Sequence, residues 1–264
     1  MDIDEASPSP ARAEFVQSLE RGLAVIRAFG AERPRMTLSD VARETGLSRA
    51  AARRFLHTLV EIGYVGTDGR EFFLRPRLLE LGFSYLSALS LPEIVQPHLQ
   101  RLSEQTGESS SAAVLDGDSI VYVARVAVRR IMSAAIGVGT RLPAYATSMG
   151  RVLLAALPGE QRGAALAEAP LRALTPGTIT DAGALSAELD RVAAQGWALV
   201  DQELEEGLRS VAAPVRDASG QVVAAINVAA PARRDRSGTD FVAPLLAAAA
   251  AVEEDLRRTG TRVR

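Results

Sequence analysis

The order of hydrophobic spacings within residues 37–74 constrains the fold of this chain more than any other feature. Two short stretches with apolar residues three and four apart predict amphipathic helices, with Gly46 ending the first and Ser48 capping the second. Residues 64–74 then alternate as strands do, around the hairpin signal Asp68-Gly69. Two short helices joined by a tight turn and followed by a hairpin predict a winged helix-turn-helix.

Another helical pattern precedes this unit. Ser18 is a suitable N-cap, and apolar residues recur at helical spacing from Leu19 to Phe29. Residues 1–14 are acidic and rich in Pro and Ser, so we expect a disordered tail there. The sequence therefore predicts a DNA-binding domain over residues 15–76.

The second helix of a helix-turn-helix places its N-terminal residues in the major groove of DNA. No acidic residue lies between Glu44 and Glu61, and arginine can bind guanine through two hydrogen bonds or neutralise a phosphate. Three arginines on a helix are also compatible with an ordinary solvated surface, but the flanking helix and hairpin favour DNA binding. The candidate DNA-binding residues are Ser48, Arg49, Ala50, Ala51, Arg53, Arg54 and, at the hairpin tip, Arg70.

Composition narrows the function classes. The 264 residues carry a net charge of −2, so any nucleic-acid contact must come from a local patch. All 30 basic residues are arginine, and there is no cysteine and only His57 and His98, so we expect no metal site and no cofactor. The absence of cysteine, of a signal-peptide pattern and of an apolar run of membrane-spanning length predicts a cytoplasmic protein without membrane contact.

The chain changes character after Pro76. Residues 77–91 form a linker, in which 77–89 predict a helix with an apolar stripe that a lone winged helix cannot bury, so we expect it to pack against a partner chain. Residues 92–264 mix strand and helix patterns and predict an α+β domain with an antiparallel sheet flanked by helices. The expected strands are 109–116, 119–126, 130–138, 197–203, 210–215 and 222–228, and helices are expected at 92–107, 148–157 and 239–258 and over much of 160–196.

Three function classes compete at this point. An enzyme with an accessory DNA-binding unit would need a catalytic motif, and the sequence has no HExxH, phosphate-binding GxxxxGK or GxSxG pattern. The adjacent serines 109–111 have no His or Lys base in a common motif. A constitutive architectural DNA binder would not need the long second domain. The sequence therefore favours a ligand-responsive transcription regulator without enzymatic activity.

Three segments carry a resemblance to a known family. They are residues 18–76, which include TLSDVARETGLSRAAARRFLHTLVEIGYV, GTRLPAYATSMGRVLLA (139–155) and GLRSVAAPVRDASGQVVAAINV (207–228). The chain resembles the IclR-type bacterial transcription regulators from about residue 15 onward. This resemblance implies a winged helix, a linker helix and a GAF-like effector-binding domain, assembled as a homodimer or a dimer of dimers on double-stranded operator DNA.

Within the family, the second domain looks most like the subgroup that controls protocatechuate and β-ketoadipate catabolism. This implies an aromatic acid or keto-diacid as effector, with another small organic acid as the alternative. Residues 147–149 offer hydroxyl groups and a helix N-terminus that favours an anion. Together with the resemblance, this gives the candidate effector-binding residues Ile131, Ser133, Thr147, Ser148, Met149, Leu208, Arg209, Ser210 and Asn227.

An effector carboxylate would need a cationic partner. The arginines that compete for this role are Arg129, Arg130, Arg141 and Arg209, each of which could instead form a surface or interface ion pair. By the same resemblance, Val200 occupies a position that is acidic in some relatives with small keto-acid effectors. Its apolar character suggests a bulkier or more apolar ligand.

Overall fold

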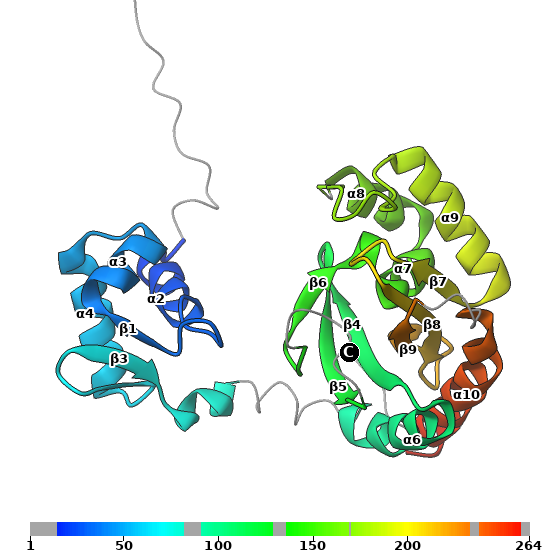
Figure 1. Ribbon diagram of the computed structural model, residues 1–264, viewed down its shortest axis with the longest axis horizontal. Coiled ribbons are helices and arrows are strands. Elements are labelled where there is room, and N and C mark those ends of the chain that lie inside the picture. Colours follow the sequence, from blue (N-terminus) through cyan, green and yellow to red (C-terminus); the bar gives the residue numbers. More distant parts are fainter. Residues whose placement is uncertain (1–14, 82–90, 129–135, 169, 233–237, 260–264) are drawn as a thin grey trace, which may run out of the picture. The chain divides into compact units, whose positions relative to one another are not determined.

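The computed structural model describes residues 15–81, 91–128, 136–168, 170–232 and 238–259. Contacts divide the chain into two compact units, Met1–Tyr85 and Leu86–Arg264 (Figure 1). The tail expected at 1–14 lies outside the described residues.

The first unit combines helices with a small sheet. Its elements are α2 (Gln17–Arg27), β1 (Arg35–Thr37), α3 (Leu38–Thr45), α4 (Arg49–Glu61), β2 (Val65–Thr67), β3 (Glu71–Leu74) and the 3-10 turn η1 (Pro76–Leu78). The three strands are antiparallel in the order β1-β3-β2. Val25, Val41 and Leu56, one from each helix, are fully buried in a common core. This arrangement confirms the predicted winged helix-turn-helix.

The helix ends of this unit follow from local chemistry. The Thr37 hydroxyl accepts a hydrogen bond from the Asp40 amide while the Asp40 carboxylate accepts one from the Thr37 amide, which forms a capping box at the start of α3. Gly46 ends that helix with φ of 67°, a left-handed conformation that suits glycine. Ser48 caps α4 by accepting a hydrogen bond from the Ala51 amide at 3.2 Å. The roles of Gly46 and Ser48 were predicted from the sequence.

Three details of this unit differ from the prediction. Helix α2 begins at Gln17 after Val16, with no side-chain cap, so Ser18 lies inside the helix rather than capping it. Ile62 continues the helical spacing of Leu56 and Leu59 in the sequence, which predicts that it is buried with them, but α4 ends at Glu61 and Ile62 is 45% exposed. The strand β1 was not predicted, since three residues are too few to show an alternating pattern.

The second unit is built on a six-stranded antiparallel sheet with strand order β6-β5-β4-β9-β8-β7. Its strands are β4 (Ser109–Asp116), β5 (Ser119–Val126), β6 (Arg141–Pro143), β7 (Ala198–Asp201), β8 (Leu208–Arg216) and β9 (Val222–Pro231). Its helical elements are α6 (Leu91–Thr106), η2 (Ala144–Ala146), α7 (Ser148–Ala155), α8 (Gly159–Glu168), α9 (Ala182–Gln195), η3 (Gly238–Phe241) and α10 (Val242–Thr259). This confirms the predicted α+β class.

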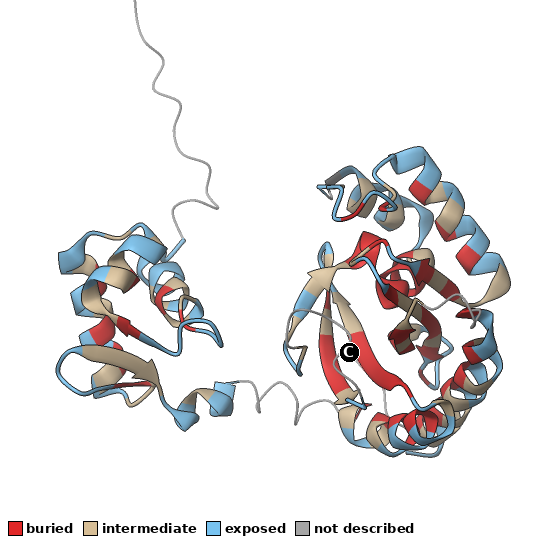
Figure 2. Cartoon of the chain, viewed as in Figure 1, coloured by how far each residue is buried: buried red, intermediate tan, exposed pale blue. Residues whose placement is uncertain are grey.

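Helices cover both faces of this sheet, and successive strand residues serve opposite faces. Ala112 of β4 packs in a core with α6 and α10, whereas Ala113 packs in a second core with α7 and α9. Figure 2 shows this burial along the strands and α7, with exposed residues on the outer side of α9. The cavity described below lies on the α7 face.

The prediction of a strand at 130–138 is wrong for residues 136–138. Residues 129–135 lie outside the described part, and residues 136–138 are not in a strand. The sheet is completed instead by the short strand β6, which pairs with β5. Of the predicted linker helix at 77–89, residues 79–81 are helical after η1, and 82–90 lie outside the described residues.

Candidate effector cavity and nucleic-acid interface

The first turns of α4 carry most of the predicted DNA-binding residues. Arg49, Arg53 and Arg54 are exposed, as is Ala50, while Ala52 on the opposite side of the helix is fully buried and fixes which side faces solvent. Ser48 stands at the helix start, where free amide groups favour a phosphate. The structure therefore presents these side chains together on one exposed surface.

These arginines differ from other arginines of the same unit in their ion pairing. Arg35 binds both Asp68 and Glu71, and Arg43 binds Asp40 at 2.7 Å. Within the described residues, the side chains of Arg49, Arg53, Arg54 and Arg70 form no ion pair or hydrogen bond. Their charges are therefore uncompensated by a contacting carboxylate, as a phosphate-binding surface requires.

Arg70 lies on a separate element, the turn between β2 and β3. The Asp68 carboxylate shapes this turn by accepting hydrogen bonds from the amides of Arg70, at 3.0 Å, and Glu71, at 2.8 Å. These bonds lower the pKa of Asp68 to about 2, with Arg35 adding to the effect. Gly69 completes the turn with φ of 92°, which leaves the Arg70 side chain exposed at the tip.

A cavity opens between the sheet of the second unit and the start of α7. It encloses about 550 Å³ including its open mouth, while its interior has room for about two water molecules. The walls are mostly apolar, with Met149, Val200 and Leu204 among them. Its lining residues are Ser109, Tyr122, Arg125, Ile136, Ala146, Thr147, Ser148, Met149, Val200, Leu204, Leu208, Ser210, Asn227 and Ala229.

Hydrogen-bonding side chains from three elements meet in this cavity. The hydroxyl groups of Ser148, on α7, and Ser210, on β8, lie 2.7 Å apart. The Asn227 amide nitrogen, on β9, donates to the Ser210 hydroxyl at 2.9 Å. Asn227 Oδ1 is buried and has no hydrogen-bond partner within the described residues. A bound molecule with a hydrogen-bond donor would satisfy this oxygen.

Among the described residues that line the cavity, Arg125, on β5, is the cationic one. One terminal guanidinium nitrogen donates to the Ser111 hydroxyl at 3.2 Å, while Nε is buried without a partner in the part of the chain that is described. Ser111 pairs with Arg125 across β4 and β5 and with Asn227 across β4 and β9, so the two side chains belong to one row across the sheet. The unsatisfied donor and the unsatisfied acceptor therefore belong to residues two strands apart, with backbones about 10 Å from each other across the sheet.

Tyr122 also lines the cavity from β5. Burial raises the pKa of its phenol to about 12, although the nearby Arg125 acts in the opposite direction. The phenol is therefore neutral near pH 7. It offers the cavity an aromatic face and a hydroxyl group rather than a negative charge.

The structure brings together many of the predicted effector-binding residues, but not all of them. Thr147, Ser148, Met149, Leu208, Ser210 and Asn227 line the cavity. The Thr147 hydroxyl is already used as the N-cap of α7, accepting from the Gly150 amide at 3.1 Å. Ile131 and Ser133 lie outside the described residues, as do Arg129 and Arg130.

The remaining candidate arginines have other partners. Arg209 does not line the cavity: because it alternates with Leu208 and Ser210 on β8, it lies against Gly238 and binds Asp201 at 2.7 Å. Arg141 is half-exposed and bound to Asp116. The sequence analysis missed Arg125, which only the strand register brings to the cavity.

The two units together define a class of protein. An exposed, uncompensated arginine surface on a winged helix, joined in one chain to an apolar cavity with unsatisfied polar groups, is the make-up of a ligand-responsive DNA-binding regulator. Residues 18–69 match the IclR helix-turn-helix domain, and residues 83–254 match the bacterial transcriptional regulator IclR C-terminal domain. The chain belongs to the IclR family of transcription regulators.

Individual relatives narrow the comparison. The chain is 50% identical over 216 residues to the Pca regulon regulatory protein of Pseudomonas putida, and the matched region covers 81% of this chain and 74% of that protein. It is 39% identical over 240 residues to the p-hydroxybenzoate hydroxylase transcriptional activator of Acinetobacter baylyi, covering 88% and 89%. These similarities support the subgroup that regulates aromatic catabolism, and the relatives are regulators rather than enzymes.

Solved structures agree. A transcriptional regulator from Rhodococcus sp. RHA1 superposes with a TM-score of 0.81 at 56% identity, covering 93% of this chain and all of that one. An IclR homolog from Microbacterium hydrocarbonoxydans, solved in complex with 4-hydroxybenzoate, also gives 0.81 at 31% identity, covering 91% and 99%. Within the described residues, no helix is long and apolar enough to cross a membrane.

Proposed function

We propose that this regulator responds to a small hydroxylated aromatic acid of the protocatechuate or 4-hydroxybenzoate type, bound in the cavity of its second unit. The observation that carries the proposal is the pair of buried, unsatisfied atoms, Arg125 Nε and Asn227 Oδ1. A ligand that satisfies both must present an acceptor to one and a donor to the other. A hydroxybenzoate has both, with its carboxylate and its phenol at opposite ends of a rigid ring.

The remaining walls suit such a ring. The carboxylate lies beside Arg125, and the hydroxyl group donates to Asn227 Oδ1, next to the hydroxyl groups of Ser148 and Ser210. Met149, Val200 and Leu204 supply apolar contacts to the carbon skeleton. The names of two relatives point to the same chemistry, because one is an activator for p-hydroxybenzoate hydroxylase and another was solved with 4-hydroxybenzoate.

A keto-diacid such as β-ketoadipate is the second candidate. The 50% identity to the Pca regulon regulatory protein favours it, although that name describes the genes that the relative regulates and not the molecule that it binds. Two carboxylates and a ketone offer only acceptors near pH 7, so Asn227 Oδ1 would stay without a donor. The cavity chemistry therefore favours the hydroxylated ring.

For the first unit, we propose that Ser48, Arg49, Ala50, Ala51, Arg53 and Arg54 enter the major groove and that Arg70 contacts the adjacent backbone or minor groove. The protein acts as a homodimer or dimer of dimers on a two-fold operator. Leu19 and Leu23 support this assembly, because they are 63% and 46% exposed on α2 and a second copy would bury them. A bacterial regulator acts where the operator DNA is, so we propose the cytoplasmic location that the sequence analysis expected.

Calorimetry on the full chain tests the effector. We expect binding of protocatechuate or 4-hydroxybenzoate, weaker binding of benzoate, which lacks the phenol, and weaker binding of β-ketoadipate. Arg125→Met should weaken binding about 10- to 150-fold, because a charge-assisted hydrogen bond contributes about 1.5–3 kcal/mol. Ser148→Trp should block binding by filling the cavity.

The matched control is Arg141→Met, which removes an arginine of the same sheet that does not line the cavity. Arg125→Met and Ser148→Trp should both bind DNA as tightly as the wild type in the absence of effector. If none of the acids binds the wild-type chain, the proposed effector class is wrong. If Arg125→Met binds as tightly as Arg141→Met, the carboxylate lies elsewhere.

A further inference from the structure

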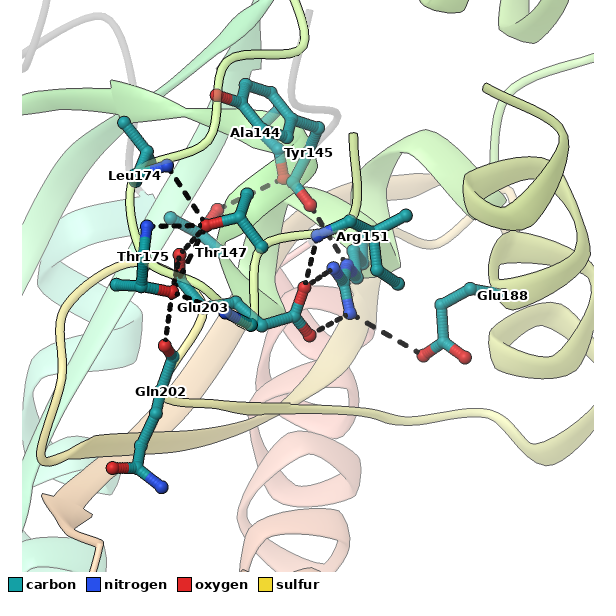
Figure 3. A network of polar contacts seen from close by, with 12 residues as sticks. Ala144, Tyr145, Thr147, Arg151, Leu174, Thr175, Glu188, Gln202 and Glu203 are labelled. Atoms are coloured by element: carbon teal, nitrogen blue, oxygen red, sulfur yellow. Dashed lines mark hydrogen bonds and ion pairs between the residues drawn. The ribbon is translucent and has the colours of Figure 1, made fainter. Parts of the chain in front are cut away.

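An arginine is completely buried one turn behind the cavity. Arg151, on α7, is 1% exposed, and its guanidinium forms two hydrogen bonds with the carboxylate of Glu203, at 2.8 and 2.5 Å (Figure 3). Its Nε donates to the Tyr145 carbonyl oxygen at 2.9 Å, and Glu188 lies 3.8 Å away as a second carboxylate. Neither Arg151 nor Glu203 lines the cavity.

From this arrangement we infer that Arg151 and Glu203, the clasp pair, are positioning residues for the effector. The pair holds the β7–β8 loop, residues 202–207, against α7, so that Leu204 keeps its place in the cavity wall. This inference rests on the proposed function, because the wall matters to a ligand in that cavity.

The connection between the pair and the cavity is short on both sides. Ser148 and Met149 precede Arg151 by less than one turn of α7, and both line the cavity. On the other side, Leu204 follows Glu203 directly. The ion pair therefore joins the helix wall of the cavity to its loop wall.

Glu203 fixes more than its own side chain. Its carboxylate also accepts from the Ile179 amide at 3.1 Å, and its carbonyl oxygen accepts from the Thr178 hydroxyl at 2.6 Å. The Thr175 hydroxyl donates to the Gln202 carbonyl oxygen at 2.7 Å. Figure 3 shows these hydrogen bonds as dashed lines around Gln202 and Glu203.

The loop backbone is held in an unfavourable conformation. Gln202 has φ of 59°, the one positive value at a non-glycine position among the described residues. Such a conformation persists only where the surroundings determine it, and strain of this kind is often found at ligand sites. Without the clasp pair, the loop would relax and withdraw Leu204 from the wall.

Stability alone does not account for a buried ion pair at this place. Removing two charges from water is costly, and apolar side chains of similar volume often give an equally stable core. What an apolar pair cannot reproduce is the fixed, two-pronged geometry of a guanidinium on a carboxylate. This difference separates positioning from stability in an experiment.

The test compares the single variant Glu203→Leu with the double variant Arg151→Met/Glu203→Leu in the full chain. We expect the single variant to lower the melting temperature, because it removes both short hydrogen bonds of the buried Arg151 guanidinium and leaves it only Glu188, 3.8 Å away, as a carboxylate partner. The double variant should recover most of that loss yet bind protocatechuate or 4-hydroxybenzoate at least tenfold more weakly than wild type. DNA affinity without effector should be unchanged. The control Asp190→Asn, which breaks the α8–α9 ion pair with Arg162, should bind effector normally.

Hydrogen exchange of residues 202–208 gives a readout that does not need the effector. The Gln202 amide donates to the Leu208 carbonyl oxygen at 2.7 Å and the Gly207 amide to Gln202 Oε1 at 3.1 Å, so both are protected while the loop is held. We expect faster exchange of these amides in the double variant despite its recovered melting temperature. Wild-type exchange or wild-type effector affinity in that variant would overturn the inference. If the wild-type chain binds no acid, the proposed function fails, while exchange still decides the role of the pair.

Discussion

Gly150 offers the sharpest test of how the cavity is built. A Cβ atom at this position would lie 2.1 Å from the carbonyl oxygen of Ala144 and 2.4 Å from its Cα. Both are backbone atoms, so no side chain can turn away to make room. Non-bonded atoms need about 3.5 Å, and Gly150→Ala therefore forces α7 and η2 apart by more than about 1 Å. Since overpacking costs about 1–3 kcal/mol, we expect a loss near the upper end.

Thermal unfolding of the full chain, followed by circular dichroism, measures this loss. A change of about 2–3 kcal/mol corresponds to a fall of roughly 4–12 °C in the transition of the second unit. The control is Gly163→Ala in α8, where an added Cβ meets nothing within 4 Å. That change should stabilise the helix by about 0.5–1 kcal/mol. If Gly150→Ala unfolds at the wild-type temperature, the contact between α7 and η2 does not have the tightness described above.

Three further predictions concern the first unit. If Arg53 contacts a base, Arg53→Ala should weaken operator binding by about 1–3 kcal/mol, and if Arg53 contacts a phosphate, the variant should lower the salt dependence of binding by about one unit of slope. The control is Arg43→Ala. If Arg53→Ala changes neither the affinity nor the salt dependence, α4 is not the recognition helix. Asp68 should titrate near pH 2 rather than at its ordinary 3.8 when its carboxyl carbon is followed by NMR. Because its pKa is lowered in the folded state, its stabilisation of the hairpin is complete above about pH 4 and disappears as the pH falls through 2; a midpoint near 4 would contradict the hydrogen bonds at this turn. Light scattering at micromolar concentration should show a dimer or tetramer that Leu19→Glu weakens, and a monomeric wild type would refute assembly through α2.

Local chemistry explains why the first unit was predictable. The caps at Thr37 and Ser48 and the glycine at Gly46 act within three or four residues, so their consequences can be read directly from the sequence. Ser18 shows the limit of such reasoning. A serine before an apolar run is a suitable cap, but the helix already starts at Gln17, and nothing local decides between the two registers.

The cavity depends on a feature that no local pattern reveals. A bulge between Ala112 and Ala113 shifts the pairing of β4 with β5, so that Ala112 faces Ala124 while Ala113 faces Tyr122. Strict alternation from Tyr122 would turn Arg125 away from the α7 face. With Val123 as the extra residue, Tyr122 and Arg125 share that face, and both line the cavity. Arginine candidates chosen from sequence motifs therefore omitted the one that lies there.

The narrow interior of the cavity bears on how an effector would act. Room for about two water molecules cannot accept an aromatic ring, so binding must move at least one wall. The sheet is covered on its other face, Gly150 packs tightly on Ala144, and Arg151 ties α7 to Glu203, so these walls keep their places and the movement falls on the rest of the lining. A ligand shifts a conformational equilibrium only by binding one state better than another. An effector that binds only the widened cavity supplies that difference in affinity, and a coupling of about 1–3 kcal/mol to operator binding is the ordinary size of such an effect.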